Sequence, residues 1–362
     1  MSTDDGIGSD DGDVGAAAPK ATRGAARRRP RKRATATQRP DVFHVARDAD
    51  YLRQLRVEEE FWDNRTETML SKTPSPAVQR FQNERLTGDG GRQWFETIGD
   101  YGEFEQGCVL GAGPALIESH LLERHPQLHL TVYDISGDSL ARLQDRLEMK
   151  FPGRVETRQE DLNFVTLPAD AYDLVVANSC VHHIVNLEHL AFQVNQCLTG
   201  DGVFFMNDTV GESYFQFSEE KKRLYQAFVD ATHDNPGRAS AIRWPDRDNW
   251  AFSPFESVRS GEILDIFQGY LREVRVRTAG ALLELTLFGG PQRGGLRLRL
   301  LRRLVRAALR LRLLRLKSYI ARGRARGQLL FLLDSICSDT GYLKPGVAFA
   351  IYQKRATDGS EE

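Results

Sequence analysis

The chain has 362 residues, of which 41% are hydrophobic and 27% are charged, and its formal net charge at pH 7 is −1. This length allows one large domain with additions, or two domains, and the composition is that of a soluble globular protein. No apolar run of about 18 residues and no apolar signal core are present, so we expect neither a membrane span nor an export signal.

The four cysteines, Cys108, Cys180, Cys197 and Cys337, show neither paired nor metal-like spacing. Two of them fall in predicted core strands. Scattered cysteines of this kind are typical of a reducing compartment, so the predicted location is cytoplasmic and no metal site is predicted.

Residues 1–45 are predicted to form a disordered tail. It begins with five aspartates and continues with a run of lysine and arginine among Ala, Pro and Thr. So little apolar surface is available that burial would not offset the entropy lost on ordering. The basic run either binds nucleic acid or anionic lipid, or is a solvated tail without a specific partner.

Residues 46–100 are predicted to form a helical cap. The pattern between Tyr51 and Arg80 is helical, and Ser75-Pro76 has the form of an N-cap followed by proline at the first helical position. These helices either cover an active site or simply pack on the sheet.

Residues 101–290 are predicted to form an α/β core in which strands and helices alternate. Its central motif is Cys108–Leu110, a short apolar strand, followed by Gly111-Ala112-Gly113 and an amphipathic helix. Glycine lets a ligand approach the backbone, and free N–H groups at a helix N-terminus bind carboxylate or phosphate.

A second predicted strand, Leu128–Asp134, ends in an acid about 20 residues after the glycines, where it would meet ribose hydroxyls. A dinucleotide fold would need G-x-G-x-x-G, but Leu116 occupies the position of the third glycine. The spacing instead resembles that of the class I S-adenosylmethionine (SAM) methyltransferases, of the bacterial small-molecule type. The resemblance covers Gly102 to Met206 and returns at Leu330–Lys354.

Two further blocks carry the same resemblance: Arg158–Asn163, and the strand and loop Tyr172–Ile184. It implies a Rossmann-like doubly wound sheet, mostly parallel with an antiparallel last strand, and SAM as cofactor. By resemblance the cofactor-binding residues are Gly111, Ala112, Gly113 and Ala115 near the methionine portion, Asp134 and Ile135 near the ribose, Asp161 and Leu162 near the adenine, and Asn178.

The chain departs from the family pattern at two positions. Val109 stands where the family has an acid, which removes one polar group near the amino-acid end of the cofactor. Ala115 replaces the third glycine of the G-x-G-x-G turn that the family has here, and it is small enough to be tolerated.

The predicted catalytic residues are His182 and His183, which follow the fourth strand of the resemblance. A neutral imidazole there would take the proton from an attacking hydroxyl, and His183 is the preferred base. The alternative is that the histidines only shape the pocket wall. Asn178-Ser179-Cys180-Val181 lacks the Asn/Asp-Pro-Pro-Tyr/Phe motif of nucleic-acid amino methyltransferases, which argues against methylation of adenine or cytosine amino groups.

Beyond this point the pattern predicts helices at Ser139–Phe151, Leu187–Leu198, Ser213–Asp234 and Ile263–Leu271. It also predicts a loop near the pocket mouth at Trp244–Pro254, and strands at Val203–Met206, Glu273–Arg277 and Val347–Gln353. The last helix and strand of the core are assigned to residues 328–356, and residues 357–362 are predicted to be disordered.

Residues 291–327 form a basic insertion with many arginines and no acid. On a helical wheel the basic residues fall on one side and leucines on the other. Such a helix is typical of a peripheral membrane contact, here through residues 296–319, or of a partner-binding surface. The alternative is a helix packed on its own core, with its arginines in water.

The sequence therefore predicts a SAM-dependent methyltransferase acting on a small molecule, at a hydroxyl, with a membrane- or lipid-linked acceptor as one possibility. Two alternatives remain. One is an RNA methyltransferase that uses the basic segments, although nucleic acid is the less favoured partner. The other is a non-catalytic methyltransferase-like protein that binds a membrane or a partner, which the valine at position 109 favours.

Overall fold

The computed structural model describes residues 45–64, 75–232, 242, 244–245, 253–287 and 314–356, with side chains from residue 323 in the last range. The predicted tail up to residue 44, most of the basic insertion and residues 357–362 lie outside the described residues. Trp250 and Phe252 of the predicted pocket-mouth loop lie outside them as well.

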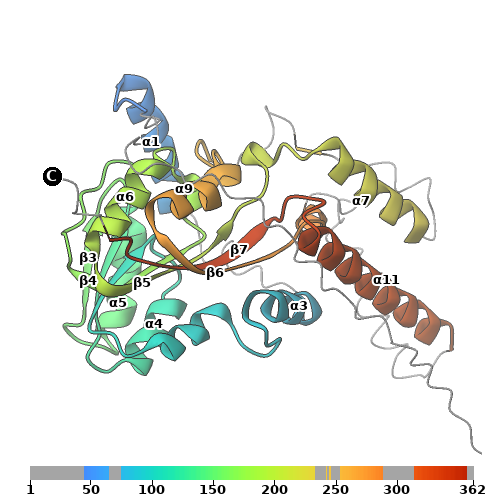
Figure 1. Cartoon of the computed structure of the whole chain (residues 1–362), viewed down its shortest axis with the longest axis horizontal. Coiled ribbons are helices and arrows are strands. Elements are labelled where there is room, and N and C mark those ends of the chain that lie inside the picture. Colours follow the sequence, from blue (N-terminus) through green and yellow to red (C-terminus); the bar gives the residue numbers. More distant parts are fainter. Residues whose placement is uncertain are drawn as a thin grey trace, which may run out of the picture. The chain divides into compact units, whose positions relative to one another are not determined.

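The core is a seven-stranded sheet with the strand order β3-β2-β1-β4-β5-β7-β6 (Figure 1). The first five strands in the chain are parallel, and β7 pairs antiparallel with both β5 and β6. The prediction of a mostly parallel Rossmann-like sheet with an antiparallel last strand is confirmed. The strands are β1 (Gln106–Leu110), β2 (His129–Asp134), β3 (Val155–Gln159), β4 (Tyr172–Asn178), β5 (Leu198–Thr209), β6 (Arg272–Ala279) and β7 (Val347–Gln353).

Helices cover both faces of the sheet, because alternate residues of each central strand point to opposite sides. In β1, Cys108 and Leu110 pack into one apolar cluster and Val109 into the other. The first cluster is completed by α6 (Leu187–Cys197) and α9 (Ile263–Tyr270). The second is completed by α4 (Leu116–Arg124), α5 (Gly137–Glu148) and the 3₁₀ segment η1 (Trp94–Tyr101).

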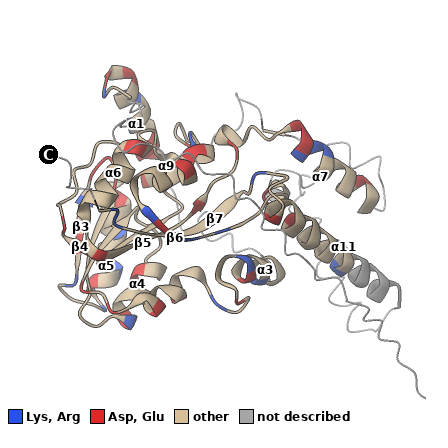
Figure 2. Ribbon diagram, in the orientation of Figure 1, with Lys and Arg blue, Asp and Glu red and all other residues tan. Residues whose placement is uncertain are grey.

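The edge strand β6 differs from the central strands in its charge. Its sequence, REVRVRTA, contains three arginines and one glutamate, and basic residues mark it in Figure 2. Charged side chains on an edge strand oppose pairing with a strand of another molecule. The last strand, β7, lies one position inside this edge.

The two N-terminal helices pack in different places. Helix α1 (Ala49–Asp63) packs through Tyr51 into a small cluster with Val185, Phe255 and Val258. Helix α3 (Pro76–Thr87) begins at the predicted Ser75 cap, with proline in its first turn, and its Phe81 stacks on Phe331 with ring centroids 4.5 Å apart. Helix α1 therefore covers the cavity described below, whereas α3 packs against the C-terminal helix that contains Phe331.

The prediction of one helix over Ser213–Asp234 was wrong at its start. A short 3₁₀ segment, η3 (Ser213–Phe215), comes first, and Tyr214 and Phe215 have positive φ angles that interrupt an α-helix. Helix α7 (Glu219–Thr232) begins after Ser218, whose hydroxyl accepts from the Lys221 N–H at 3.2 Å. Residues 233–234 lie outside the described residues.

Helix α5, by contrast, begins earlier than predicted, because Ser136 caps it by accepting a hydrogen bond from the backbone N–H of Ser139. The C-terminal helix α11 (Leu314–Asp339) is continuous through residue 327, where the sequence divided the insertion from the core. The other short 3₁₀ segments are η2 (Val181–His183), η4 (Ser260–Glu262) and η5 (Leu283–Leu287). Of the helices in the described ranges, none combines the length and apolarity that a bilayer span requires.

Candidate functional site

A cavity of about 320 Å³ opens at the carboxyl ends of the parallel strands. In open α/β sheets this edge is where ligands bind, between strands whose connections run in opposite directions. The segments that follow β1, β2, β3 and β4 all contribute to its wall, and α1 closes it from above. The lining residues are Leu55, Glu58, Trp62, Gly111–Pro114, Asp134, Ile135, Asp161–Asn163, Asn178–Cys180, His183, Ile184 and Phe255.

The glycine turn after β1 is shaped for close approach. Gly111 has φ +87°, and a Cβ there would lie 2.7 Å from Cys180 Cβ, so a side chain has neither the backbone conformation nor the space it needs. A Cβ on Gly113 would meet nothing within 4 Å, so this residue leaves open space beside the turn.

Asp134 ties the glycine turn to the end of β2. Its Oδ2 accepts from the Ala112 N–H at 2.6 Å and its Oδ1 from the Ser136 N–H at 2.7 Å. Burial, partly offset by these two donors, raises the pKa of Asp134 to about 6. Each carboxylate oxygen has two lone-pair sites, so the side chain can still accept hydrogen bonds from a bound diol.

Asp161 is held from two directions at the other end of the cavity. The Tyr51 hydroxyl on α1 donates to its Oδ2 at 2.8 Å, and its Oδ1 accepts from the Asn163 backbone and side-chain amide. Burial and the neighbouring Asp161 carboxylate raise the pKa of Tyr51, so the phenol stays protonated and remains a donor. In the sequence Tyr51 was only the start of a helical pattern.

The two predicted histidines have different surroundings. His183 lines the cavity, whereas His182 is buried behind it and Nδ1 of its ring lies 2.5 Å from Asp208 Oδ1. A carboxylate only accepts hydrogen bonds, so Nδ1 of His182 is the donor. Burial alone would lower the pKa of His182, but the charge and hydrogen bond of Asp208, together with Glu256, raise it.

Two residues of α1 position the ring of His183. Its Nδ1 lies 3.1 Å from Glu58 Oε1, although the two groups are not aligned as a hydrogen bond, and its ring meets Trp62 edge to face at 5.2 Å. Glu58 is buried and accepts from Trp62 Nε1, Ser253 Oγ and the Phe255 N–H. Burial would raise the pKa of Glu58, but His183 and these donors lower it overall, so Glu58 is a carboxylate at neutral pH.

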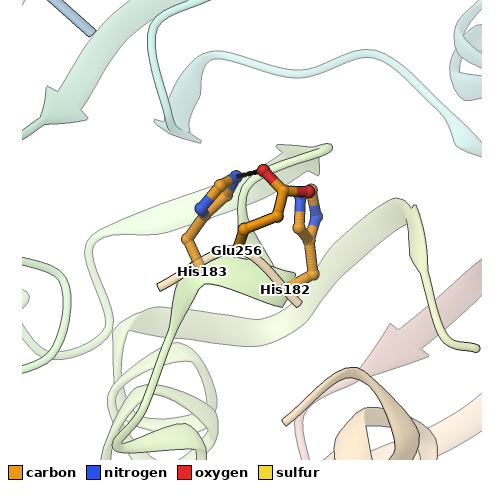
Figure 3. A group of neighbouring side chains, drawn as sticks. All are labelled: His182, His183 and Glu256. Atoms are coloured by element: carbon orange, nitrogen blue, oxygen red, sulfur yellow. Dashed lines mark ion pairs between the residues drawn. The ribbon is translucent and has the colours of Figure 1, made fainter. Parts of the chain in front are cut away.

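A third acid, Glu256, faces both histidines. Its Oε1 lies 3.7 Å from His182 Nε2 and its Oε2 lies 3.9 Å from His183 Nε2. Figure 3 shows its carboxylate between the two imidazole rings. Neither Glu58 nor Glu256 belongs to a motif, so the sequence did not reveal them, whereas Asp208 could have been noticed as an acid near the end of a predicted strand.

Nearly all predicted cofactor-binding residues meet at this one cavity: Gly111, Ala112, Gly113, Asp134, Ile135, Asp161, Leu162 and Asn178. Ala115 does not line it. It is the N-cap residue of α4, with φ +63°, and it is buried in the apolar core beneath the glycine turn.

The acid missing at position 109 has no direct substitute in the cavity wall. Val109 is buried in the core, and the nearby acid Glu118 is buried in the first turn of α4. Burial raises the pKa of Glu118 to about 7, although the N–H groups of Glu118 and Gly113 donate to it.

Comparison with known proteins identifies the domain. Residues 109–204 match the family model of a methyltransferase domain. No curated protein matches the sequence.

Several solved structures are similar to this chain. One is phosphoethanolamine N-methyltransferase 2 of Haemonchus contortus in complex with S-adenosyl-L-methionine, at 14% identity and TM-score 0.44, with 82% of this chain and 60% of that chain covered. A second is geranyl diphosphate C-methyltransferase of Streptomyces coelicolor A3(2), at 10% identity and TM-score 0.45, with 83% and 98% covered. A third is the StiE O-MT, at 18% identity and TM-score 0.41, with 81% and 82% covered. The chain thus spans 60% of the length of the H. contortus protein.

Residues 109–204 thus match a methyltransferase domain, and the sheet around them has the strand order of a Rossmann-like methyltransferase fold.

Proposed function

We propose that the chain is a SAM-dependent methyltransferase that acts on a hydroxyl group of a small-molecule acceptor, and that His183 receives the hydroxyl proton. The observation that carries the proposal is the position of His183 in the wall of the cavity that also contains the glycine turn and Asp134. A hydroxyl needs a proton acceptor as it attacks, and an imidazole is suited to this task near pH 7.

The cofactor-binding residues have separate tasks along the cavity. Gly111, Ala112 and Gly113 are proposed to lie against the methionine portion, because the turn leaves the backbone accessible there. Asp134 with Ile135 is assigned to the ribose, Asp161 with Leu162 to the adenine, and Asn178 to a further contact. Bound SAM supplies an electrophilic methyl group, so the protein mainly positions the acceptor and removes its proton.

The orientation of His183 favours the role of a base. Glu58 lies beside Nδ1, and a proton on that atom would leave Nε2 as the acceptor. Trp62 fixes the ring from its edge. With a proton on Nδ1, the fixed ring keeps Nε2 as the nitrogen that can accept the hydroxyl proton.

The wall around His183 indicates the kind of acceptor. Leu55, Trp62, Ile184 and Phe255 are apolar and line the same cavity as His183, and the Trp62 ring contacts it. Apolar walls with a few polar groups are typical of small-molecule sites. A membrane- or lipid-linked acceptor and a peripheral membrane contact through residues 296–319 are proposed from the sequence alone, and flotation with anionic vesicles tests the contact.

The experiment compares His183→Gln with His129→Gln, a matched change at an exposed histidine on β2. Both proteins are given SAM carrying a labelled methyl group, together with a panel of hydroxyl-bearing small molecules and total RNA. We expect His183→Gln to lower kcat by about 10²- to 10⁴-fold while SAM binding, measured by calorimetry, stays within about threefold.

Full activity of His183→Gln would refute the role of His183. Transfer to RNA with a steep salt dependence would favour the RNA methyltransferase instead. A folded protein that binds SAM but transfers no methyl group to any acceptor would favour the non-catalytic alternative.

A further inference from the structure

The side chains at the acceptor end of the cavity carry more negative charge than a single proton acceptor requires. Asp208, Glu58 and Glu256 converge on two imidazoles, His182 and His183. Glu58 and Asp208 also accept hydrogen bonds from neighbouring N–H and O–H groups, whereas Glu256 faces the two rings. Buried carboxylates are costly unless cations or hydrogen-bond donors compensate for them. A divalent cation would neutralise two of the three negative charges.

The geometry points to a binding site for one divalent transition-metal ion, formed by His182 Nε2, His183 Nε2 and the Glu256 carboxylate. These three ligand groups lie within 4.8 Å of one another. Zinc ligands at about 2.0–2.2 Å from the ion in tetrahedral geometry stand about 3.3–3.6 Å apart. Glu256 Oε1 lies 3.7 Å from His182 Nε2 and Glu256 Oε2 lies 3.9 Å from His183 Nε2, so the three side chains would have to move closer together around the ion.

The surroundings of the two rings agree with this assignment. In metal sites the second nitrogen of a ligating histidine usually donates to a carboxylate, which fixes the tautomer and orients the ring. Here Nδ1 of His182 meets Asp208, and Nδ1 of His183 lies beside Glu58. Both Nε2 atoms therefore face Glu256, as Figure 3 shows.

Two nitrogens and one carboxylate oxygen are ligands that suit zinc, iron(II), cobalt(II) or manganese(II) better than calcium or magnesium. Three protein ligands also leave coordination positions open for a water molecule or a substrate oxygen. Because His183 lines the cavity, we expect these positions to face it. The spacing in the sequence concealed the site, since Glu256 is more than 70 residues from the histidines.

The site gives the proposed methyl transfer a second way to handle the hydroxyl proton, and in this respect it rests on the proposed function. A hydroxyl bound to the ion would have a lowered pKa and would release its proton to solvent water more readily as its oxygen takes the methyl group from SAM. With the ion bound, His183 acts as a ligand. Without it, His183 acts as the base. Metal binding can be measured in the absence of an acceptor, so the two proposals can fail separately.

The test uses the full-length protein after chelator treatment and dialysis. Cobalt(II) is added as a spectroscopic probe at pH 7.5, and bound zinc is counted by elemental analysis in a parallel sample. We expect one equivalent of either ion, with visible cobalt absorption of low-symmetry coordination and imidazole nitrogen couplings in the electron spin-echo spectrum.

The variants are Glu256→Gln and His182→Asn, with His129→Gln as the matched control. We expect the first two to weaken metal binding by at least about 100-fold and the control to bind as the wild type does. Asp208→Asn is expected to weaken binding by about 10- to 100-fold, as loss of a partner behind a ligand does. SAM binding, measured on every variant, reports whether its fold is intact.

Wild-type protein that binds no stoichiometric zinc or cobalt would overturn the site. The site would also be overturned if Glu256→Gln and His182→Asn, both folded, still bound the ion through imidazole with wild-type affinity. If no ion binds and His183→Gln still abolishes transfer, the metal site is wrong and His183 remains the base. If the metal site is confirmed but no hydroxyl acceptor reacts, the proposed function fails and the metal site stands.

Discussion

Asp134→Asn should affect cofactor binding and stability in opposite directions. The carboxylate is partly buried between the glycine turn and α5, and its pKa is raised from 3.8 to about 6. A carboxyl whose folded-state pKa is raised contributes stability at low pH that is lost as the pH rises through the folded value. The side-chain amide of asparagine cannot ionise, so the stability of Asp134→Asn should not fall over this pH range for this reason.

The magnitude follows from the two pKa values. Between pH 5 and pH 8 the wild type should lose about 1.4 kcal/mol of unfolding free energy relative to the variant. Hydrogen bonds lost to the Ala112 and Ser136 N–H groups shift the absolute values but do not depend on pH in this range. Urea denaturation of both proteins at the two pH values measures the difference.

Cofactor binding should fall at the same time. Hydrogen bonds to a charged group contribute about 1.5–3 kcal/mol each, so losing a pair of them to the ribose weakens SAM binding by about 100-fold or more. Calorimetric titration at pH 8 measures this, with Asp138→Asn, an exposed acid in the first turn of α5, as the control. The reasoning is refuted if Asp134→Asn binds SAM within about threefold of wild type, or if its relative stability is independent of pH.

Four further predictions concern stability and are checked by urea or thermal unfolding. Gly111→Ala should destabilise the fold by about 2 kcal/mol or more, because the added Cβ meets Cys180 at 2.7 Å and φ is +87°. Ala115→Gly should stabilise the fold by about 1 kcal/mol, because it removes the strain of an alanine in the left-handed backbone conformation. If Gly111→Ala and Ala115→Gly changed the stability equally, this reasoning would be contradicted. The unfolding free energy of Glu118→Gln should rise by about 2 kcal/mol relative to that of the wild type between pH 5.5 and 8.5. Because the pKa of Glu118 is about 7 in the folded protein, the wild type loses stability as the carboxyl ionises. A variant whose relative stability instead increased as the pH fell would contradict this. Lys221→Met should cost about 3–5 kcal/mol, since it leaves Glu212 and Glu284 without their buried cation, whereas Lys222→Met at the helix surface should cost less than about 0.5 kcal/mol.

The sheet could be predicted because its central strands are buried on both faces and read as apolar runs. The last strand was predicted at Val347–Gln353, the bounds that the structure shows. The glycine turn and Asp134 were predicted together for the same reason, since both follow the ends of recognisable strands.

The remainder of the site depends on contacts between distant segments. Glu58 sits in the run Glu58-Glu59-Glu60, where nothing marks it as the one that is buried. Glu256 follows residues without a helical or strand pattern. The false helix start at Ser213 has a local cause, because the positive φ angles of Tyr214 and Phe215 are unusual for aromatic residues and no pattern announces them.

Helix α1 joins the two ends of the cavity. Tyr51 contacts Asp161 at one end and Glu58 contacts His183 at the other, and seven residues of helix separate them, or about 10 Å along its axis. Because both contacts belong to one rigid helix, a ligand that orders either end also orders the other. SAM and the acceptor should therefore bind cooperatively, each raising the affinity of the protein for the other by the same factor.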